Sequence, residues 1–328
     1  MSTTIALLGE RPDVIEQVYS SDRREILARR ATWHPRPLAN RDLVPGTPGL
    51  DRIDALFATW GLARLDDRQL DALPRVRAVF YAASSVKPFA EPMLRRGIRV
   101  ISAWSANAFP VAEFALAQVI LSLKGYFACA AWVRAGSSGS RPPVRGTFAA
   151  TIALLGYGQV ARHLRRLLRC HDLSMLVVDP YLDAATAATE QVELVSMAEA
   201  FARADVVSNH LPALPATADA VDGTLLRRLR PGATFINTGR GSTVIETDLL
   251  AVCRERGDLT VLLDVHRGST LDPALRTCPN LHVTPHIAGS LGSECLRLVD
   301  LLNEEFAAWQ DGRPLRHEVT LADLERLA

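Results

Sequence analysis

A glycine-rich turn between an apolar strand and a helix limits the possible folds of this chain more than any other feature. Residues 151–161 read TIALLGYGQVA, and a second apolar run, residues 173–178, ends in Asp179. Gly156 permits the sharp turn, and Gly158 lets the backbone approach a ligand closely. The helix that follows offers free N–H groups and the positive end of its dipole to phosphates. The pattern predicts a dinucleotide-binding βαβ unit.

The acidic residue at the end of the second run favours NAD over NADP. Asp179 is placed to accept hydrogen bonds from an adenosine ribose diol. Neither Pro180 nor Tyr181 supplies an arginine for a 2′-phosphate. The alternative is that the glycine turn is only a tight turn and binds no ligand. The flanking strand and helix, together with Asp179 at the expected spacing, make this the weaker interpretation. We therefore expect NAD as the cofactor.

Composition excludes several other classes of protein. The chain has 328 residues, 48% of them hydrophobic, which is enough for two domains with substantial cores. A net charge of +1 indicates neither a nucleic-acid nor a membrane-surface partner. The five cysteines are widely spaced and lack metal-ligand spacing, so we expect reduced thiols, no metal and a cytoplasmic protein. The longest apolar helix, residues 110–123, carries Glu113 and is too short to span a membrane.

Strand-like and helical patterns alternate along the chain. A first α/β unit contains helical stretches such as Val14–Arg29, and a long helix opened by Pro110 connects it to the second unit. A last helix, Glu294–Trp309, returns to the first unit. We expect a Rossmann-type doubly wound parallel sheet in residues 107–290, inserted into a smaller flavodoxin-like α/β substrate domain of residues 1–106 plus 291–328. The strands expected in the larger domain are residues 151–156, 173–179, 205–211, 233–238, 259–265 and 281–285.

Two polar side chains at strand ends suggest a reaction. Arg240 follows one expected strand and His286 follows another, and such ends form the ligand-binding edge of a doubly wound sheet. Taken singly, each is more often a surface charge or an ordinary loop residue. Together, arginine offers a forked cation for a carboxylate, and histidine moves a proton near neutral pH. Hydride transfer to a carbonyl acid needs both groups.

The chain resembles the D-isomer-specific 2-hydroxyacid dehydrogenases over nearly its whole length. The segments that carry the resemblance are residues 106–114, the glycine turn with Asp179, and residues 210–212, 235–241, 263–265 and 279–289. The resemblance implies that Arg240 binds the substrate carboxylate and polarises its carbonyl. It also implies that His286 is the general acid/base, and that the enzyme is a homodimer.

The resemblance also assigns binding residues. Around the cofactor it places Gly156, Gly158, Gln159, Val160, Asp179, Leu211, Pro212, Thr217, Thr238, Gly239, Asp264 and His286. Within this set Gln159 and Val160 would meet the pyrophosphate, and Asp264 the nicotinamide amide. The turn that contains Ala83, Ser84 and Ser85 would hold the substrate carboxylate. Lys87 after it either adds a cation or is simply exposed.

One position departs from the family pattern. Relatives carry a glutamate five residues after the aspartate of the Leu-Asp-Val strand, and this chain has Ser269 there. A serine can orient the catalytic imidazole but brings no charge. Asp272 could replace the glutamate if the loop is shifted, and the sequence leaves this open. His266 and Arg267 either suit a more anionic substrate or are two exposed loop residues.

The sequence therefore predicts an NAD-dependent oxidoreductase that transfers hydride between nicotinamide and C2 of a small 2-oxo or 2-hydroxy acid. The main alternative is an NAD(H)-binding protein with little or no turnover, in which Ser269 marks lost catalysis. Oxidation of formate is a weaker third interpretation.

Overall fold

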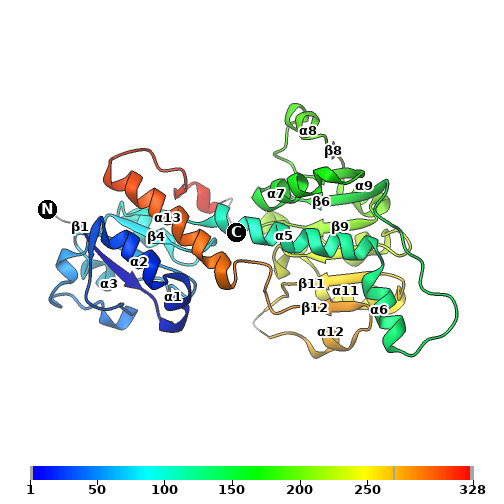
Figure 1. The fold of residues 1–328 in the computed structure, drawn as a ribbon, viewed down its shortest axis with the longest axis horizontal. Coiled ribbons are helices and arrows are strands. Elements are labelled where there is room, and N and C mark those ends of the chain that lie inside the picture. Colours follow the sequence, from blue (N-terminus) through cyan, green and yellow to red (C-terminus); the bar gives the residue numbers. More distant parts are fainter. Residues whose placement is uncertain (1–2, 269, 326–328) are drawn as a thin grey trace. The chain divides into compact units, whose positions relative to one another are not determined.

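A computed structural model describes residues 3–268 and 270–325 and divides the chain into two compact units (Figure 1). Unit 1 contains the residues up to Asn107 and from Ser290 onward, and unit 2 is Ala108–Gly289. Each unit is a mostly parallel sheet with helices on both faces. The expected α/β fold class is therefore confirmed.

Unit 1 contains a six-stranded sheet in the order β13-β5-β4-β3-β1-β2, parallel except for β13. Its strands are β1 Thr3–Leu8, β2 Ala31–Trp33, β3 Ala55–Ala58, β4 Ala78–Tyr81, β5 Arg99–Ser102 and β13 Glu318–Val319. Its helices are α1 Pro12–Val18, α2 Ser21–Ala28, α3 Asp67–Asp71, α4 Ala90–Arg95 and α13 Cys295–Gln310.

Alternate residues of the unit 1 strands enter two separate cores. On one face, Phe57 and Phe80 pack with Phe306 of α13, and their rings lie 4.9–5.4 Å apart. On the other face, Val79 packs with Met93 of α4. The C-terminal helix α13 thus covers strands from the start of the chain and contacts α1 and α2 (Figure 1).

Unit 2 contains a seven-stranded parallel sheet in the order β12-β11-β10-β9-β6-β7-β8. Its strands are β6 Ala150–Leu155, β7 Leu173–Val178, β8 Glu193–Leu194, β9 Val206–Asn209, β10 Thr234–Asn237, β11 Thr260–Leu263 and β12 Leu281–Val283. Its helices are α6 Tyr126–Arg134, α7 Gln159–Leu167, α8 Ala184–Glu190, α9 Met197–Arg203, α10 Gly223–Arg227, α11 Glu246–Glu255 and α12 Pro273–Thr277. The strand order reverses between β6 and β9, which is where open α/β sheets bind ligands.

Three differences separate the structure from the sequence expectation. The stretch 14–29 forms two helices rather than one, because Tyr19 leaves the helix and donates from its buried hydroxyl to the Ala58 carbonyl at 2.8 Å. The connecting helix α5, Trp104–Leu123, begins before Pro110 and contains it. The short strands β2, β8 and β13 were not expected.

Helix α5 is consequently longer than the sequence suggested. Among residues 3–268 and 270–325, it is the one helix long and apolar enough to span a membrane by length and composition. A core helix of a globular protein passes the same test, and 39% of the apolar stretch is buried within the structure.

Candidate active site

The glycine turn after β6 has the geometry of a phosphate cradle. Gly156 adopts a φ of +83°, and a Cβ there would lie 3.2 Å from the His210 carbonyl oxygen. Gly158 precedes α7, and the space that its Cβ would occupy is open. No side chain caps the N-terminus of α7, where Gln159 and Val160 lie. Free N–H groups beside open space fit a pyrophosphate.

Asp179 joins this turn to the end of β7. One carboxylate oxygen accepts the Tyr157 N–H at 2.6 Å, and the other accepts the Tyr181 N–H at 2.8 Å. Each oxygen has capacity for a further hydrogen bond, since a carboxylate accepts about four in all. Asp179 is half-buried, so these bonds hold the carboxylate beside the turn in a position that a ribose diol fits.

A buried amide network supports the neighbouring loops. The Asn209 side chain donates to Asn237 Oδ1 at 3.1 Å and to Thr243 Oγ1 at 2.8 Å. Its own oxygen accepts the Leu211 N–H at 3.1 Å, and Asn237 Oδ1 accepts the Gly239 N–H at 3.1 Å. The network therefore fixes the loops after β9 and β10, which contain the sequence-predicted Leu211, Pro212, Thr238 and Gly239.

Sequence reasoning did not identify this network. A signal was present, because β9 and β10 are apolar strands that both end in asparagine. The hydroxyl of Thr217, expected to line the cofactor, lies within hydrogen-bond distance of the Pro212 and Leu214 carbonyls and so stabilises its own loop.

His210 links the same two strand ends. Its Nε2 lies 2.9 Å from Ser208 Oγ, and its Nδ1 lies 3.2 Å from Thr238 Oγ1. Burial lowers the pKa of His210 to about 4, so the imidazole is neutral near pH 7. A neutral ring can accept from one hydroxyl and donate to the other, and it adds no charge to the cofactor edge.

This burial predicts a pH dependence of stability. The pKa of His210 is about 4 in the folded chain against an ordinary value of 6.5, so the unfolded chain takes up the proton first. Above pH 6.5 the neutral ring makes its full contribution to the free energy of unfolding. As the pH falls from 6.5 toward 4, this contribution is lost, which lowers the free energy of unfolding by about 1–3 kcal/mol. Urea unfolding between pH 6.5 and 4 should show that the free energy of unfolding decreases more steeply with falling pH in the wild type than in His210→Asn. Equal slopes would contradict the assignment.

Arg240 lies just after β10 and is half-buried. Its guanidinium donates to the Gly239 carbonyl at 2.9 Å, and burial lowers its pKa, although an arginine stays charged. Across the described ranges 3–268 and 270–325, no carboxylate pairs with it. A half-buried cation without a counter-ion is costly unless an anion binds there. Arg240 is therefore a candidate anion-binding residue.

Gly241 explains how this arginine is held. A Cβ at Gly241 would lie 2.1 Å from the carbonyl carbon and oxygen of His266, so the loop after β11 packs directly on the Arg240 loop. The Thr243 hydroxyl also donates to the Arg240 carbonyl at 2.7 Å. Only a glycine permits this contact.

We expect Gly241→Ala to lower the free energy of unfolding by about 1–3 kcal/mol. It should also reduce activity, because relieving the clash displaces the Arg240 loop. Chemical denaturation and steady-state kinetics measure the two effects. Gly257→Ala is the matched control, since the space around Gly257 is open. Equal behaviour of the two variants would show that the Gly241 contact is unimportant.

The segment after β12 places His286 in an unusual conformation. His286 has a φ of +58°, and its imidazole is exposed within unit 2. Asp264, at the end of β11, accepts the Thr284 hydroxyl at 2.6 Å and the N–H groups of Ile287 and Ala288 at 2.8 and 2.9 Å. A left-handed histidine held this firmly is a strained residue of the kind that gathers at functional sites. Asp264 is thus a brace for the His286 loop.

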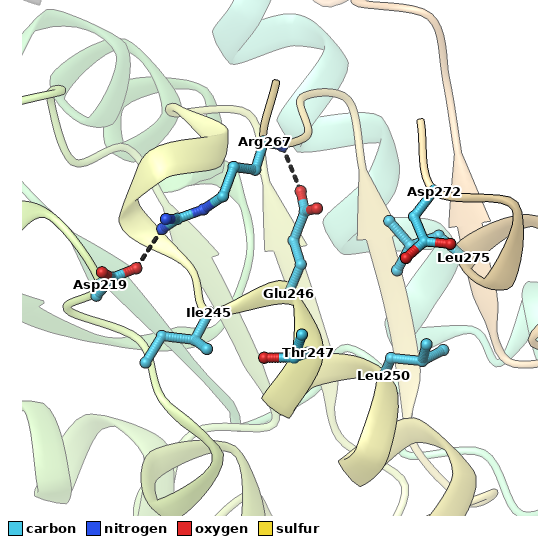
Figure 2. Close-up of a pocket in the computed structure, with 8 residues that line it drawn as sticks. All are labelled: Asp219, Ile245, Glu246, Thr247, Leu250, Arg267, Asp272 and Leu275. Carbon is cyan, nitrogen blue, oxygen red and sulfur yellow. Dashed lines mark hydrogen bonds and ion pairs between the residues drawn. The ribbon is translucent and has the colours of Figure 1, made fainter. Parts of the chain in front are cut away.

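Arg267 is engaged elsewhere than at a substrate. Figure 2 shows its guanidinium paired with Asp219 and its N–H donating to Glu246. The guanidinium also donates to the Ser242 and Val244 carbonyls at 3.0 and 3.3 Å. The charge of Arg267 is therefore paired, and its side chain joins the loop after β11 to the segment that follows Arg240.

Asp272, which could replace the missing glutamate, is hydrogen-bonded within its own segment. It accepts the Ala274 N–H at 2.8 Å as the N-cap of α12. With Arg267 it lines a cavity of about 330 Å³ whose apolar side includes Leu250 and Leu275 (Figure 2). In the part of the chain that the structure describes, it makes no hydrogen bond to His286. Ser269 itself lies outside the described residues.

In unit 1, the turn of Ala83, Ser84 and Ser85 follows β4. The Ser102 hydroxyl contacts the Ala83 and Ser84 carbonyls at 2.9 and 2.8 Å, and Thr59 donates to the preceding carbonyl at 3.0 Å. Within the described ranges, no hydrogen bond takes the N–H groups of Ser84 or Ser85. The turn is fixed through its carbonyls and leaves N–H groups available. Ser102 and Thr59 were not predicted, and Lys87 is exposed.

The chain is similar to known proteins of one enzyme family. The family described as "D-isomer specific 2-hydroxyacid dehydrogenase, NAD binding domain" matches residues 116–288. A (S)-sulfolactate dehydrogenase of Chromohalobacter salexigens is 33% identical over 69% of this chain and 75% of its own length. A D-3-phosphoglycerate dehydrogenase of Mycobacterium leprae is 27% identical over 94% of this chain, which spans 60% of that relative.

Solved structures show the same fold. A phosphoglycerate oxidoreductase from Rhizobium etli has a TM-score of 0.79 at 21% identity and covers 97% of each chain. A D-2-hydroxyisocaproate dehydrogenase has a TM-score of 0.79 at 18% identity and covers 97% of this chain and all of its own. The chain therefore belongs to the D-isomer-specific 2-hydroxyacid dehydrogenases and contains their NAD-binding domain.

Proposed function

We propose that this protein reduces a small 2-oxo acid with NADH, or oxidises the matching 2-hydroxy acid with NAD. The observation that carries the proposal is Arg240, a half-buried guanidinium that pairs with no carboxylate among the described residues, at the same sheet edge as the strained His286. We also propose that unit 2 is the cofactor domain. Unit 1 is then the substrate domain and contributes the turn of Ala83, Ser84 and Ser85.

The roles of the residues follow from their chemistry. Bound NADH supplies the hydride for the carbonyl carbon. Arg240 orients the substrate carboxylate through two parallel N–H donors and draws charge toward the carbonyl oxygen. His286, when protonated, gives its proton to that oxygen, a contribution of typically ~10²–10⁴-fold. Asp264 keeps His286 in place, and the Asn209 network keeps the Arg240 loop in place.

The substrate is tested by NADH consumption with a panel of 2-oxo acids. The panel should include pyruvate, hydroxypyruvate and the oxo acids of sulfolactate and 3-phosphoglycerate, the substrates named for two relatives. Because Arg267 is paired with Asp219, we expect no preference for the doubly anionic members. NADH binding without turnover on any member would favour the alternative of a protein that has lost catalysis at Ser269.

We expect a preference for NADH over NADPH that depends on Asp179. Asp179→Ala should weaken NADH binding and narrow the preference, because both the ribose hydrogen bonds and the repulsion of a 2′-phosphate disappear. Losing about 1–2 kcal/mol corresponds to roughly 5–30-fold in the dissociation constant. Fluorescence titration of both cofactors measures this. Wild-type protein that binds NADPH as tightly as NADH would overturn the assignment.

We further propose a cytoplasmic homodimer formed through unit 2. Large apolar side chains on α5, α6 and the segment before β6 are exposed, including Tyr126 at 54%, Val133 at 66% and Phe148 at 77%. Tyr126 and Val133 lie seven residues apart on α6 and so share one face of that helix, which makes this face a candidate association surface. The five cysteines are unpaired, as expected in a reducing compartment. Sedimentation analysis should give a dimer for the wild type and a monomer for Val133→Asp with Phe148→Asp, and a monomeric wild type would refute the proposal.

A further inference from the structure

Three polar side chains of unit 1 form a hydrogen-bonded chain that the dehydrogenase chemistry does not use. Ser105 Oγ lies 2.8 Å from His317 Nε2, and His317 Nδ1 lies 2.8 Å from Glu305 Oε1. Ser105 is the second residue of α5, Glu305 lies on α13, and His317 follows α13. The carboxylate is 5% exposed, so it faces the imidazole with little competition from water.

Neighbouring groups hold the imidazole in this position. The Ser102 N–H donates to the His317 carbonyl at 3.0 Å, and the Trp104 ring packs edge-on against the imidazole at 5.7 Å between ring centres. Glu305 also accepts the Arg316 N–H. A carboxylate only accepts, so in the neutral imidazole of His317 Nδ1 donates to Glu305 and Nε2 presents its lone pair to the Ser105 hydroxyl. This is the arrangement in which histidine serves as the base for a serine nucleophile.

The backbone beside Ser105 adds a second requirement for acyl transfer. In the described ranges 3–268 and 270–325, no hydrogen bond takes the N–H groups of Ser105 and Ala106. They lie in the first turn of the 20-residue helix α5, at the positive end of its dipole. Two such N–H groups next to a nucleophile can stabilise the oxyanion of a tetrahedral intermediate.

We propose that Ser105, His317 and Glu305 form a hydrolytic site for short-chain carboxylic esters. Ser105 Oγ bonds to the ester carbonyl carbon while its proton passes to His317 Nε2, and the carbonyl oxygen becomes an oxyanion beside the two N–H groups. The bond from this carbon to the alcohol oxygen then breaks, and His317 returns its proton to the departing alcohol. Water, deprotonated by His317, attacks the acyl group in the same way, releases the carboxylic acid and restores Ser105. Glu305 stabilises the imidazolium at each stage.

The test is hydrolysis of para-nitrophenyl acetate by the full-length protein, with no cofactor or 2-oxo acid present. Its outcome is therefore independent of the proposed dehydrogenase activity. We expect a burst of nitrophenol as the acyl-enzyme forms, followed by slower steady turnover. Ser105→Ala should abolish the burst and lower the steady rate by about 10²-fold or more, and His317→Gln should have a similar effect. Ser20→Ala, which changes a half-buried serine that donates to Asp22, should retain the wild-type rate.

Covalent labelling separates loss of the nucleophile from loss of the fold. A fluorophosphonate should modify the wild-type protein on the peptide that contains Ser105, as read by mass spectrometry, and should modify Ser20→Ala equally. Thermal unfolding of each variant reports whether it is folded. Failure of the folded wild type to react, a label on another serine, or equal hydrolysis by wild type and folded Ser105→Ala would overturn the proposal.

Discussion

Replacing Arg240 with lysine is expected to lower kcat/KM for 2-oxo acid reduction by about 10²-fold, although the positive charge is retained. The reason is geometric, because a lysine is a point charge and cannot present two parallel N–H donors to a carboxylate. The loss should appear mostly in KM for the oxo acid, with further loss in kcat if the guanidinium also polarises the carbonyl.

A matched control separates this effect from a general change of arginine to lysine. Arg203 pairs with Glu193 on the exposed surface of unit 2, and Arg203→Lys should leave kcat/KM unchanged. NADH affinity should be near normal in both variants. If Arg240→Lys retains wild-type kcat/KM, Arg240 is a structural residue and the proposed substrate contact is wrong.

Replacing His286 with asparagine is expected to lower kcat by about 10²–10⁴-fold. Asparagine tolerates the left-handed backbone that His286 adopts at a φ of +58°, so the variant removes the proton donor with little added strain. An alanine at this position would remove the proton donor and strain the left-handed backbone together, so the two effects could not be separated. NADH titration and thermal unfolding verify that the site and the fold persist.

The same variant also tests which group transfers the proton. Reduction requires a proton donor at the carbonyl oxygen, and His286→Asn removes the donor that we propose. Unchanged kcat in this variant would assign the proton transfer to another group.

Much of the fold could be predicted because its physical signal is local. The central strands of unit 2 are buried on both faces, so they appear in the sequence as short apolar runs. Six strands begin within one or two residues of the expected positions, namely β6, β7, β9, β10, β11 and β12. Where tertiary contacts dominate, the prediction was wrong. The break at Tyr19 depends on a hydroxyl bond to Ala58, 39 residues away. The two-residue strands β8 and β13 exist only through pairing with β7 and β5.

The candidate site divides in the same way. Arg240, His286 and the glycine turn could be placed at strand ends from spacing alone. The partners of these residues could not be predicted, because they are far away in the sequence. Asp264 is hydrogen-bonded to residues 20 to 24 positions later in the His286 loop, and Asn209 is hydrogen-bonded to Thr243, 34 positions later. Such bonds are set by which strands become neighbours. The role of Asp272 depended on the start of α12, a short helix that the sequence pattern did not reveal.

The most direct test of the account is a single turnover with NADH and a 2-oxo acid, comparing the wild type with the Arg240→Lys, His286→Asn double variant. Each protein is saturated with NADH, mixed with the most active oxo acid of the panel, and assayed for NADH absorbance and for the 2-hydroxy acid product. We predict one equivalent of hydroxy acid per NADH oxidised in the wild type, and a rate at least about 10²-fold lower in the double variant, with NADH still bound. NADH that binds the wild type but is never oxidised, or equal rates in the two proteins, would contradict the central claim.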